Sequence, residues 1–371
     1  MKLKAILKWI VRLLLLALVI AFVWGFIAYW TSTNDCNRNA SAPTNLMKAI
    51  RYCEYGVANV KLQDVEKPVP NDDQVLIKVR ASSLNAFDAG VIRDSWLVRL
   101  FFGLRKPRDT RLGQDVAGQV EAVGKNLTQF KPGDEVFGLC RGGLAEYTCT
   151  RERALAAKPP NVTFEQAASL PLAGSVALQG LREGKIQPGQ KVLINGATGG
   201  VGTFAVQIAK SLGAEVTAVC STRNVDVVRS IGADHVIDYT KEDFTKSDQR
   251  YDVIFDNVCN HSFAERRRVL NPKGICVLAG IGGSGVTSGQ AIGRIASNIF
   301  TVRALSSFMN HKFTVYGIKT SKPDLIMLGD LTQTGKLKPV IERTYKLDEA
   351  PEAFRQLDAG HARGKLVVTV P

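Results

Sequence analysis

Histidine is scarce in this sequence of 371 residues, and its cysteines show no metal-binding spacing. There are 4 histidines and 7 cysteines, and no two cysteines form a C-x-x-C pair. An odd set without such a pair signals neither a disulfide framework nor a cysteine zinc site, so we expect free, mostly buried thiols. Cys259 and His261 are neighbours, but two ligands without a third rarely hold a metal. We therefore predict no bound metal.

Acidic residues are also outnumbered. The chain has 48 Lys and Arg against 34 Asp and Glu, a formal net charge of +14 at pH 7. This balance suits an anionic partner, which could be a phosphorylated cofactor, an acidic lipid surface or nucleic acid. No zinc-finger spacing, RNP-like aromatic motif or basic recognition helix is present, and we interpret Arg266, Arg267 and Arg268 as a solvated helix face. We therefore expect no nucleic-acid partner.

One long apolar run lies near the N-terminus. Residues 13–30 carry no charge and follow a basic stretch, and about 20 apolar residues cross a bilayer as a helix. We predict that residues 1–30 form an uncleaved single-pass membrane anchor and that residues 31–46 form a polar linker. The orientation is in conflict, because basic residues before a span stay cytoplasmic and send the following chain across. A catalytic body that uses a nicotinamide cofactor belongs in the cytoplasm.

A glycine-rich turn gives the strongest indication of function. It lies between a short apolar strand at residues 192–195 and a helical pattern at 203–210, and a second apolar run follows at 215–220. Small residues there let bare backbone N–H groups approach a pyrophosphate at the start of a helix. Ala stands where the dinucleotide fingerprint usually has its first Gly. The predicted cofactor-binding residues are Ala197, Thr198, Gly199, Gly200, Val201 and Gly202.

The segment after residue 220 favours NADPH over NADH. In NAD-preferring folds a carboxylate about 20 positions beyond the glycine turn binds the ribose hydroxyls. Here that place holds Ser221, Thr222 and Arg223, and an arginine offers phosphate oxygens a fixed fork of donors. A solvated arginine at a helix start is the alternative, although a cation there is mildly unfavourable. Asn257 follows an apolar run at the carboxyl end of a strand, where doubly wound sheets bind ligands, and is a further predicted cofactor contact.

The rest of the pattern divides the chain into two domains. Residues 47–162 consist of short strands and turns, whereas strands alternate with helices from Thr163 to about residue 280. Thr163 and Gln166 have the spacing of a capping box. Residues 280–293 are rich in Gly and Ser and are predicted to form a mobile loop. Further expected elements are strands at 74–80, 115–123, 135–139, 339–345 and 365–370, and helices at 324–335 and 347–360.

Seven stretches together resemble a known family. They are residues 70–79, 83–88, 113–124, 131–138, 142–147, the glycine turn and 360–365. This combination resembles the medium-chain dehydrogenase/reductase superfamily, in its zinc-free quinone oxidoreductase branch, over residues 47–371. The resemblance implies an α/β fold. A GroES-like β-rich catalytic domain (47–162 and 311–371) would lie beside a Rossmann domain (163–310), a doubly wound parallel sheet that binds NADPH.

The resemblance also implies chemistry without a metal. Zinc alcohol dehydrogenases of this superfamily have a cysteine ligand where this chain has Asn85, and a His-Glu pair where it has Gln114 and Asp115. Without zinc to polarise a carbonyl, hydride passes only to an acceptor that is already electrophilic, such as a quinone or an α,β-unsaturated carbonyl. Asn85 is the expected catalytic residue, which would hydrogen-bond the acceptor oxygen. An Asn that caps a turn is the alternative.

Two further cofactor contacts follow from the resemblance. Ser175 stands where related enzymes have a hydroxyl near the nicotinamide ribose, and a helix-interior serine is the alternative. Lys365, with Arg363, resembles a C-terminal pair that contacts the cofactor, and exposed basic residues before an edge strand are the alternative. Asp88 is expected to have a structural role.

The sequence therefore predicts a membrane-tethered, NADPH-dependent, zinc-free reductase of quinones or enones, with a homodimer left open. An enoyl-type reductase of lipid or polyketide metabolism remains an alternative, as does a non-catalytic NADPH-binding partner protein. The apolar residues of 94–109, among them Trp96, Leu100 and Phe101, are expected to pack in the core. Lining a pocket or touching lipid are the other options.

Overall fold

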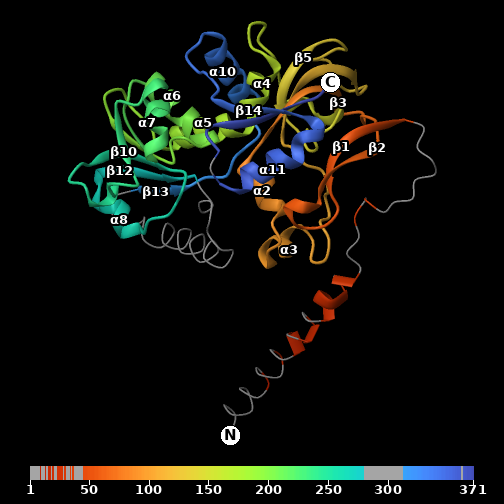
Figure 1. The fold of residues 1–371 in the computed structure, drawn as a ribbon, viewed down its shortest axis with the longest axis horizontal. Helices are drawn as coiled ribbons and strands as arrows, with labels where there is room; N and C mark the ends of the chain where they lie inside the picture. The colour runs from red at the N-terminus through yellow and green to blue at the C-terminus, as the bar shows by residue number, and fades with distance from the viewer. Residues whose placement is uncertain are drawn as a thin grey trace.

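Figure 1 shows a molecule built from two sheet-centred parts that lie side by side. The structure is a computed structural model. It describes residues 45–279, 312–360 and 362–371 and, before them, positions 9, 13, 16, 17, 19, 20, 23–27, 29, 30, 34 and 36. The predicted mobile loop at 280–293 lies outside the described residues.

The first part is a seven-stranded sheet with a two-stranded sheet beside it. The strand order of the larger sheet is β14-β15-β3-β4-β5-β7, and β6 pairs with β3. The C-terminal strand β15 runs antiparallel to β3 and parallel to β14, so the last residues of the chain complete this sheet. Its strands are β3 (Gln74–Leu84), β4 (Asp115–Val123), β5 (Glu135–Leu139), β6 (Tyr147–Arg151), β7 (Leu155–Ala157), β14 (Ile341–Lys346) and β15 (Lys365–Thr369); the smaller sheet is β1 (Leu46–Tyr52) and β2 (Val60–Glu66).

The second part is a six-stranded parallel sheet with the order β10-β9-β8-β11-β12-β13. Numbered along the chain within this sheet, that is 3-2-1-4-5-6, the order of dinucleotide-binding folds. Its strands are β8 (Lys191–Asn195), β9 (Glu215–Cys220), β10 (His235–Asp238), β11 (Tyr251–Asp256), β12 (Leu270–Leu278) and β13 (Lys312–Val315). The predicted domain boundary at residues 310 and 311 thus falls just before a strand of this sheet.

Apolar side chains cover the six-stranded sheet on both faces. Val192 and Ile194 pack into one core with residues of α5, α6 and α10, whereas Leu193, between them on β8, packs into a second core with Phe244 and Val269. Successive residues of a strand point to opposite faces. A continuous apolar run is therefore what a strand buried on both sides requires, and the predicted α/β architecture is confirmed.

The described helices lie around these sheets. In Figure 1, α6 and α7 lie above the six-stranded sheet and α8 lies below it. The helices are α2 (Ala86–Ile92), α3 (Trp96–Phe102), α4 (Phe164–Ser169), α5 (Pro171–Glu183), α6 (Gly200–Ser211), α7 (Val225–Ser230), α8 (Phe263–Arg268), α10 (Lys322–Gln333) and α11 (Ala350–Asp358). Short 3-10 turns are η2 (Val57–Asn59), η3 (Glu152–Ala154), η4 (Thr222–Asn224), η5 (Phe244–Lys246) and η7 (Leu347–Glu349).

Local signals in the sequence anticipated several of these elements. The predicted strands at 115–123, 135–139 and 215–220 have the observed bounds. The predicted capping box is also present. The Thr163 hydroxyl accepts from the Gln166 N–H at 3.2 Å, and the Thr163 N–H donates to Gln166 Oε1 at 3.0 Å. Each bond gives a backbone N–H group at the start of α4 a hydrogen-bond partner.

The predicted single-pass membrane anchor is not supported. Crossing a bilayer takes about 20 apolar residues in one helix, and α5, for comparison, has 13. Among the residues that the structure describes, no helix combines the length and the apolar character that a membrane span needs. The predicted localisation, a single-pass N-terminal anchor, is corrected on this finding.

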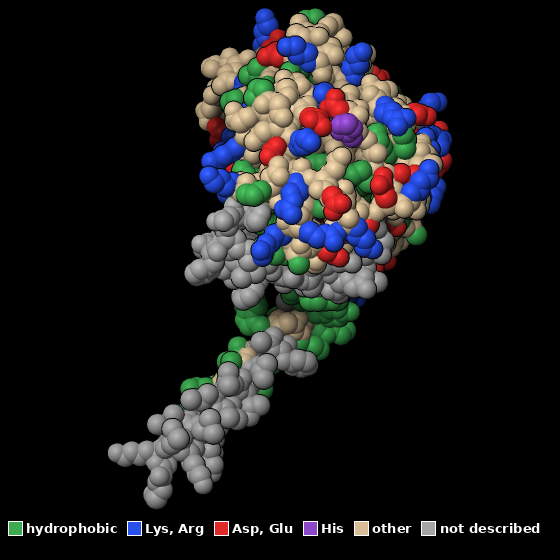
Figure 2. Space-filling model, turned by 90° about the vertical axis from the view of Figure 1, so that its left-hand side faces the viewer, with side chains coloured by type: hydrophobic (Ala, Val, Ile, Leu, Met, Phe, Trp, Pro, Cys, Tyr) green, Lys and Arg blue, Asp and Glu red, His purple; other side chains and the backbone are tan. Residues whose placement is uncertain are grey.

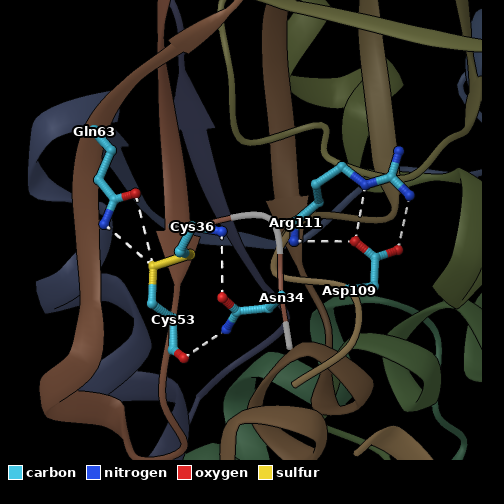
Figure 3. The surroundings of a disulfide bond; sticks show 6 residues. All are labelled: Asn34, Cys36, Cys53, Gln63, Asp109 and Arg111. Atoms are coloured by element: carbon cyan, nitrogen blue, oxygen red, sulfur yellow. Dashed lines mark hydrogen bonds and ion pairs between the residues drawn. A yellow bond between two sulfur atoms is a disulfide. The ribbon is translucent and has the colours of Figure 1, made fainter. Parts of the chain in front are cut away.

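The prediction of free thiols was wrong for two cysteines. Cys36 and Cys53 form a disulfide bond, and Cys140, Cys149, Cys220, Cys259 and Cys276 are free. Figure 3 shows that polar side chains surround the bond. Asn34 Nδ2 donates to the Cys53 carbonyl at 2.8 Å, and Gln63 Nε2 contacts Cys53 Sγ at 3.5 Å. Sequence spacing did not signal this pair, because 17 positions separate the partners and only the folded chain brings them together.

Two surface interpretations are also corrected. Arg266, predicted to be solvated, is fully buried, whereas Arg267 and Arg268 are exposed. Trp96, Leu100 and Phe101 do not pack in the core as expected, because they lie on the exposed face of α3 and are 60%, 54% and 68% exposed.

Charges of both signs share the surface. Figure 2 shows basic and acidic side chains interspersed over one face of the molecule. On this face, therefore, the excess of positive charge does not form a region of one sign.

The disulfide predicts a labelling pattern. In protein purified without reductant and then denatured, we expect iodoacetamide to modify five cysteines, and seven after reduction, as counted by mass spectrometry. Cys53→Ser should lower the free energy of unfolding by about 3 kcal/mol, because the bond closes a loop with a sequence separation of 17 and loops of about that size gain this much from a disulfide. Cys149→Ser, at a free cysteine, is the matched control. Seven labelled cysteines without reduction would show that the bond does not form.

Candidate functional site

Three strand ends of the seven-stranded sheet meet at one point. Asn85 directly follows β3, Asp115 begins β4 and Lys365 begins β15. Leu366 of β15 lies opposite Leu84 of β3 in an antiparallel register, which puts Lys365 beside Asn85. The register therefore brings an amide, a carboxylate and an ammonium group together.

These three side chains form one buried cluster. Lys365 Nζ donates to Asn85 Oδ1 at 2.6 Å and to Asp115 Oδ2 at 3.3 Å, and Asn85 Nδ2 donates to Asp115 Oδ2 at 2.8 Å. Ser83 Oγ donates to the same carboxylate oxygen at 2.6 Å. Lys365 is 2% exposed and Asp115 is fully buried. The buried carboxylate is thus balanced by the ammonium group, as a buried charge requires.

Asp115 also reaches the second part of the molecule. Its Oδ1 atom accepts from the backbone N–H of Leu172 at 2.8 Å, in the first turn of α5. Such N–H groups have no partner within the helix, and a carboxylate stabilises them. The cluster therefore links the seven-stranded sheet to the helix that packs beside the six-stranded one.

Asp88 holds the backbone of Asn85 through a hydrogen bond. Asp88 Oδ2 accepts from the backbone N–H of Asn85 at 2.9 Å, as part of the capping box that begins α2, and Oδ1 accepts from Gly113 N–H at 3.2 Å. Burial raises the pKa of Asp88 to about 6, because the ionised form loses its solvation. The expected structural role of Asp88 agrees with these bonds.

The glycine turn follows β8 as the sequence predicted. Gly196 has φ +82°, which places it in the left-handed region that suits glycine. The Ala197 N–H donates to Val219 O at 3.1 Å, and Gly199 is the N-cap of α6. Gly196 thus provides the tight turn one residue before the position where the fingerprint usually has its first Gly. This explains why Ala197 is tolerated there.

The three glycines after Ala197 have different surroundings. A Cβ atom on Gly202 would lie 2.1 Å from the carbonyl oxygen of Gly196, so this position admits no side chain. A Cβ atom on Gly200 would lie 3.0 Å from Lys365 Cδ, whereas the nearest atom to one on Gly199 would be 3.7 Å away. Gly202 is therefore needed for packing. A Cβ atom on Gly199 would make only ordinary van der Waals contacts, and Gly199 caps the N-terminus of α6, the kind of place that favours a pyrophosphate.

The two groups of predicted residues lie next to each other. Gly199 and Gly364 form a parallel bridge, and the Gly364 N–H donates to Thr198 O at 2.8 Å. The residue that follows, Lys365, packs its aliphatic stem against Gly200. The sequence could not show this contact, because more than 160 positions separate the two segments in the chain.

The residues predicted for the ribose phosphate directly follow β9, next to the end of β10. Thr222 Oγ1 donates to Asp238 Oδ2 at 2.5 Å, and Ser221 Oγ accepts from Asn224 Nδ2 at 3.1 Å. The Thr222 hydroxyl lowers the pKa of Asp238 to about 2. Arg223 is exposed on the same short turn. A carboxylate is thus present near this end after all, but it comes from the neighbouring strand.

The other predicted contacts lie in different settings. Val201 packs against the core in the first turn of α6. Asn257 follows β11, and its side chain lies beside the glycine turn, because its Nδ2 atom would be 4.0 Å from a Cβ atom on Gly199. Ser175 is buried in the middle of α5 and remains a predicted contact.

Sequence reasoning missed the central role of Asp115, which it treated only as a lost zinc ligand. One signal was available. Asp115 and Lys365 each stand at the head of an apolar strand, where an unpaired charge would be costly to bury, so each needed a partner of opposite sign. Their distance in sequence, 250 positions, hid the pairing.

A cavity of about 490 Å³ lies elsewhere, between the chain around Lys158 and helix α10. Lys322, Ile326 and Asp330 are among its lining residues, and it contains none of the predicted site residues. The glycine turn and the cluster around Asp115 therefore remain the better candidate site.

Comparison with protein families agrees with this geometry. Residues 71–160 match the family model described as "Alcohol dehydrogenase GroES-like domain", and residues 231–368 match "Zinc-binding dehydrogenase". The 2-methylene-furan-3-one reductase of Solanum lycopersicum is 33% identical over 353 residues, which cover 90% of this chain and 81% of that protein. The chain belongs to the medium-chain dehydrogenase/reductase superfamily. Within it, the protein is a quinone oxidoreductase-like enzyme.

Other relatives of this oxidoreductase have related names. The chloroplastic quinone-oxidoreductase QR1 of Triphysaria versicolor is 33% identical and covers 87% of this chain and 98% of that protein. The trans-enoyl reductase pgmF of Aspergillus terreus is 34% identical, with coverages of 89% and 98%. The solved quinone oxidoreductase of Coxiella burnetii has a TM-score of 0.76 at 31% identity and covers 88% of this chain and 100% of that chain. Relatives named as NAD(P)H or NADPH-dependent oxidoreductases, together with the strand order of the six-stranded sheet, support a nicotinamide cofactor.

The raised pKa of Asp88 predicts how stability depends on pH. The ordinary value is 3.8 and the folded value is about 6, so the folded state holds this proton more tightly. The stabilisation is present below about pH 4 and is lost as the pH rises through about 6. Relative to Asp88→Asn, we expect the free energy of unfolding of the native enzyme to fall by about 3 kcal/mol over this range.

Urea unfolding of both proteins at a series of pH values measures this difference. Asp226→Asn, at an exposed carboxyl on α7, is the control. A constant difference between the native enzyme and Asp88→Asn across the range would contradict the assignment.

Proposed function

We propose that this oxidoreductase transfers hydride from NADPH to a quinone or an α,β-unsaturated carbonyl without the help of zinc. The observation that carries the proposal is the contact between the glycine turn and the buried cluster of Lys365, Asn85 and Asp115. Bound NADPH would supply the hydride. The protein would supply orientation, exclusion of water and hydrogen bonds to the acceptor.

The donors of the cluster suit an acceptor oxygen that becomes negative. Asn85 accepts from Lys365 through its oxygen and gives one N–H to Asp115, so its amide is held in one orientation. The second N–H makes only a long contact of 3.5 Å with Ser83 O. We assign it to the acceptor oxygen, where a preorganised donor next to a buried cation stabilises developing charge. The capping role of Asn85 on α2 is the structural alternative.

A catalytic zinc does not fit this set of groups. The oxygen of Asn85 and the carboxylate of Asp115 already bind the ammonium of Lys365. Among the described residues, no group of three or more His, Cys, Asp and Glu side chains is arranged to hold a metal ion. Although the family model that matches residues 231–368 is described as zinc-binding, these contacts support a zinc-independent enzyme.

A related activity has support of its own. The relatives named as trans-enoyl reductase and CurK enoyl reductase suggest that an enoyl thioester is the second candidate acceptor. Such a substrate is also an α,β-unsaturated carbonyl compound, and the same donors would serve it. The two proposals therefore differ in the acceptor alone.

Turnover assays separate these acceptors. With NADPH in excess, we expect quinones or 2-alkenals to oxidise NADPH, which is measured as a fall in its absorbance. Enoyl thioesters test the second candidate in the same assay. Dialysis against a metal chelator should leave the rate within twofold of the untreated enzyme, because no step needs zinc. Loss of activity that added zinc restores would refute the zinc-independent proposal. Binding of NADPH without turnover of any acceptor would leave a non-catalytic NADPH-binding protein.

The preference for NADPH is supported by the residues after β9. Ser221, Thr222 and Arg223 occupy the place of the usual NAD-binding carboxylate, and the carboxylate of Asp238 nearby is bound by the hydroxyls of Thr222 and Thr240. Arg223 would contact the 2′-phosphate. If Asp238 instead received the ribose hydroxyls, NADH would be preferred.

Replacement of Arg223 tests the cofactor. We expect Arg223→Ala to raise the KM for NADPH by about tenfold or more, the value of a charge-assisted hydrogen bond, and to change the KM for NADH little. Arg229→Ala, which removes the same charge from the exposed end of α7, is the matched control. An equal rise in the KM for NADPH and for NADH would contradict the assignment of the 2′-phosphate to Arg223.

A further inference from the structure

A second buried ion pair lies close to the residue that precedes the glycine turn. Asp256, the last residue of β11, and Arg266, on α8, are both fully buried, and Arg266 Nε donates to Asp256 Oδ2 at 2.6 Å. Among the described residues, Nη2 of Arg266 has no hydrogen-bond partner. A buried ion pair often stabilises a fold no better than apolar side chains of the same size. Stability alone therefore does not account for this buried pair.

The second carboxylate oxygen of Asp256 organises two strand ends. Oδ1 accepts from Asn195 Nδ2 at 2.8 Å, from the Cys259 N–H at 2.8 Å and from the Val258 N–H at 3.2 Å. Asn195 is the last residue of β8 and directly precedes Gly196. One carboxylate thus holds both the strand that enters the glycine turn and the chain that leaves β11.

The chain that leaves β11 has a conformation that needs such support. Cys259 has φ +56°, in the left-handed region that residues other than glycine seldom adopt. The bond from its N–H to Asp256 fixes this turn. Strained backbone of this kind persists only where its surroundings determine it.

Asn257 is the residue that this turn presents. Its backbone N–H donates to Asn195 O at 3.1 Å. Its Nδ2 atom would lie 3.9 Å from a Cβ atom on Gly196 and 4.0 Å from one on Gly199. The side chain of Asn257 therefore lies beside Gly199 at the N-terminus of α6, where the pyrophosphate would bind.

We propose that Asp256, charge-balanced by Arg266, is a positioning residue for the dinucleotide site, which holds Asn257 and the glycine turn in the geometry that binds the cofactor. The inference rests on the proposed cofactor function. Asp256 acts through Asn195 and Asn257 and does not touch the cofactor itself. The groups that it holds face the pyrophosphate side of the site, which NADPH and NADH share, so its effect does not depend on the 2′-phosphate.

Variants of the pair test this role. For each variant, quenching of protein fluorescence measures the equilibrium binding of NADPH and NADH, and the melting temperature measures stability. Asp256→Asn keeps the size of the side chain but removes its charge. We expect it to weaken both cofactors by a similar factor of tenfold or more. The double variant Asp256→Asn/Arg266→Met removes both charges, and it should regain most of the melting temperature without regaining affinity. Arg267→Ala, on the exposed side of the same helix, is the control and should bind as the native enzyme does.

The outcomes separate positioning from simple stability. A double variant that regains both the melting temperature and native affinity would overturn the proposal, since the pair would then only stabilise the fold. A loss confined to NADPH would also overturn it. If Asp256→Asn alone does not fold, Arg266→Lys replaces it in the test, because it keeps the charge without the planar fork. We expect it to weaken the binding of both cofactors by a smaller factor. If the native enzyme binds neither cofactor, the proposed function itself fails.

Discussion

The carboxylate of Asp115 links the two parts of this molecule. It receives Ser83 and Asn85 from the end of β3, Lys365 from the start of β15 and a backbone N–H from the start of α5. A fully buried carboxylate is stable only if its charge is balanced and its oxygens are bonded. The positions of β15 and α5 relative to β4 are therefore constrained by one charge, and the constraint also orients Asn85.

The second buried pair follows the same principle in the other sheet. Asp256 with Arg266 orders the ends of β8 and β11, much as Asp115 with Lys365 orders the ends of β3, β4 and β15. Between the two pairs lies the glycine turn, which contacts Asn257 on one side and the segment of Gly364 and Lys365 on the other. The candidate cofactor site is thus bordered by two buried, hydrogen-bonded networks. Such support keeps binding groups close to their productive geometry.

Membership of the superfamily leaves the chemistry of the cluster open. The C-terminal family model carries a zinc-binding description, yet in this chain an ammonium group occupies the acceptor atoms of Asn85 and Asp115. A fixed cation beside a held amide offers electrostatic stabilisation of an oxyanion without a metal. This difference, rather than the fold, underlies the proposal of a reductase for acceptors that are already electrophilic.

The sequence by itself determined the features that depend on near neighbours. These are the strands at 115–123 and 215–220, the capping box of Thr163 and the strand, turn and helix around Gly199. Periodicity, capping and glycine conformations act over a few residues, so a single sequence displays them. The membrane anchor inferred from an apolar run was not supported by the described residues.

Only the tertiary structure decided which charges are paired and which cysteines are joined. Lys365 lies 280 positions from Asn85, Cys36 lies 17 positions from Cys53, and Arg266 faces inward although its two neighbours in sequence face solvent. These contacts depend on strand register and on how the chain returns to complete the first sheet. A buried charge takes whichever partner the fold brings within a few ångströms, and sequence distance carries no information about that choice.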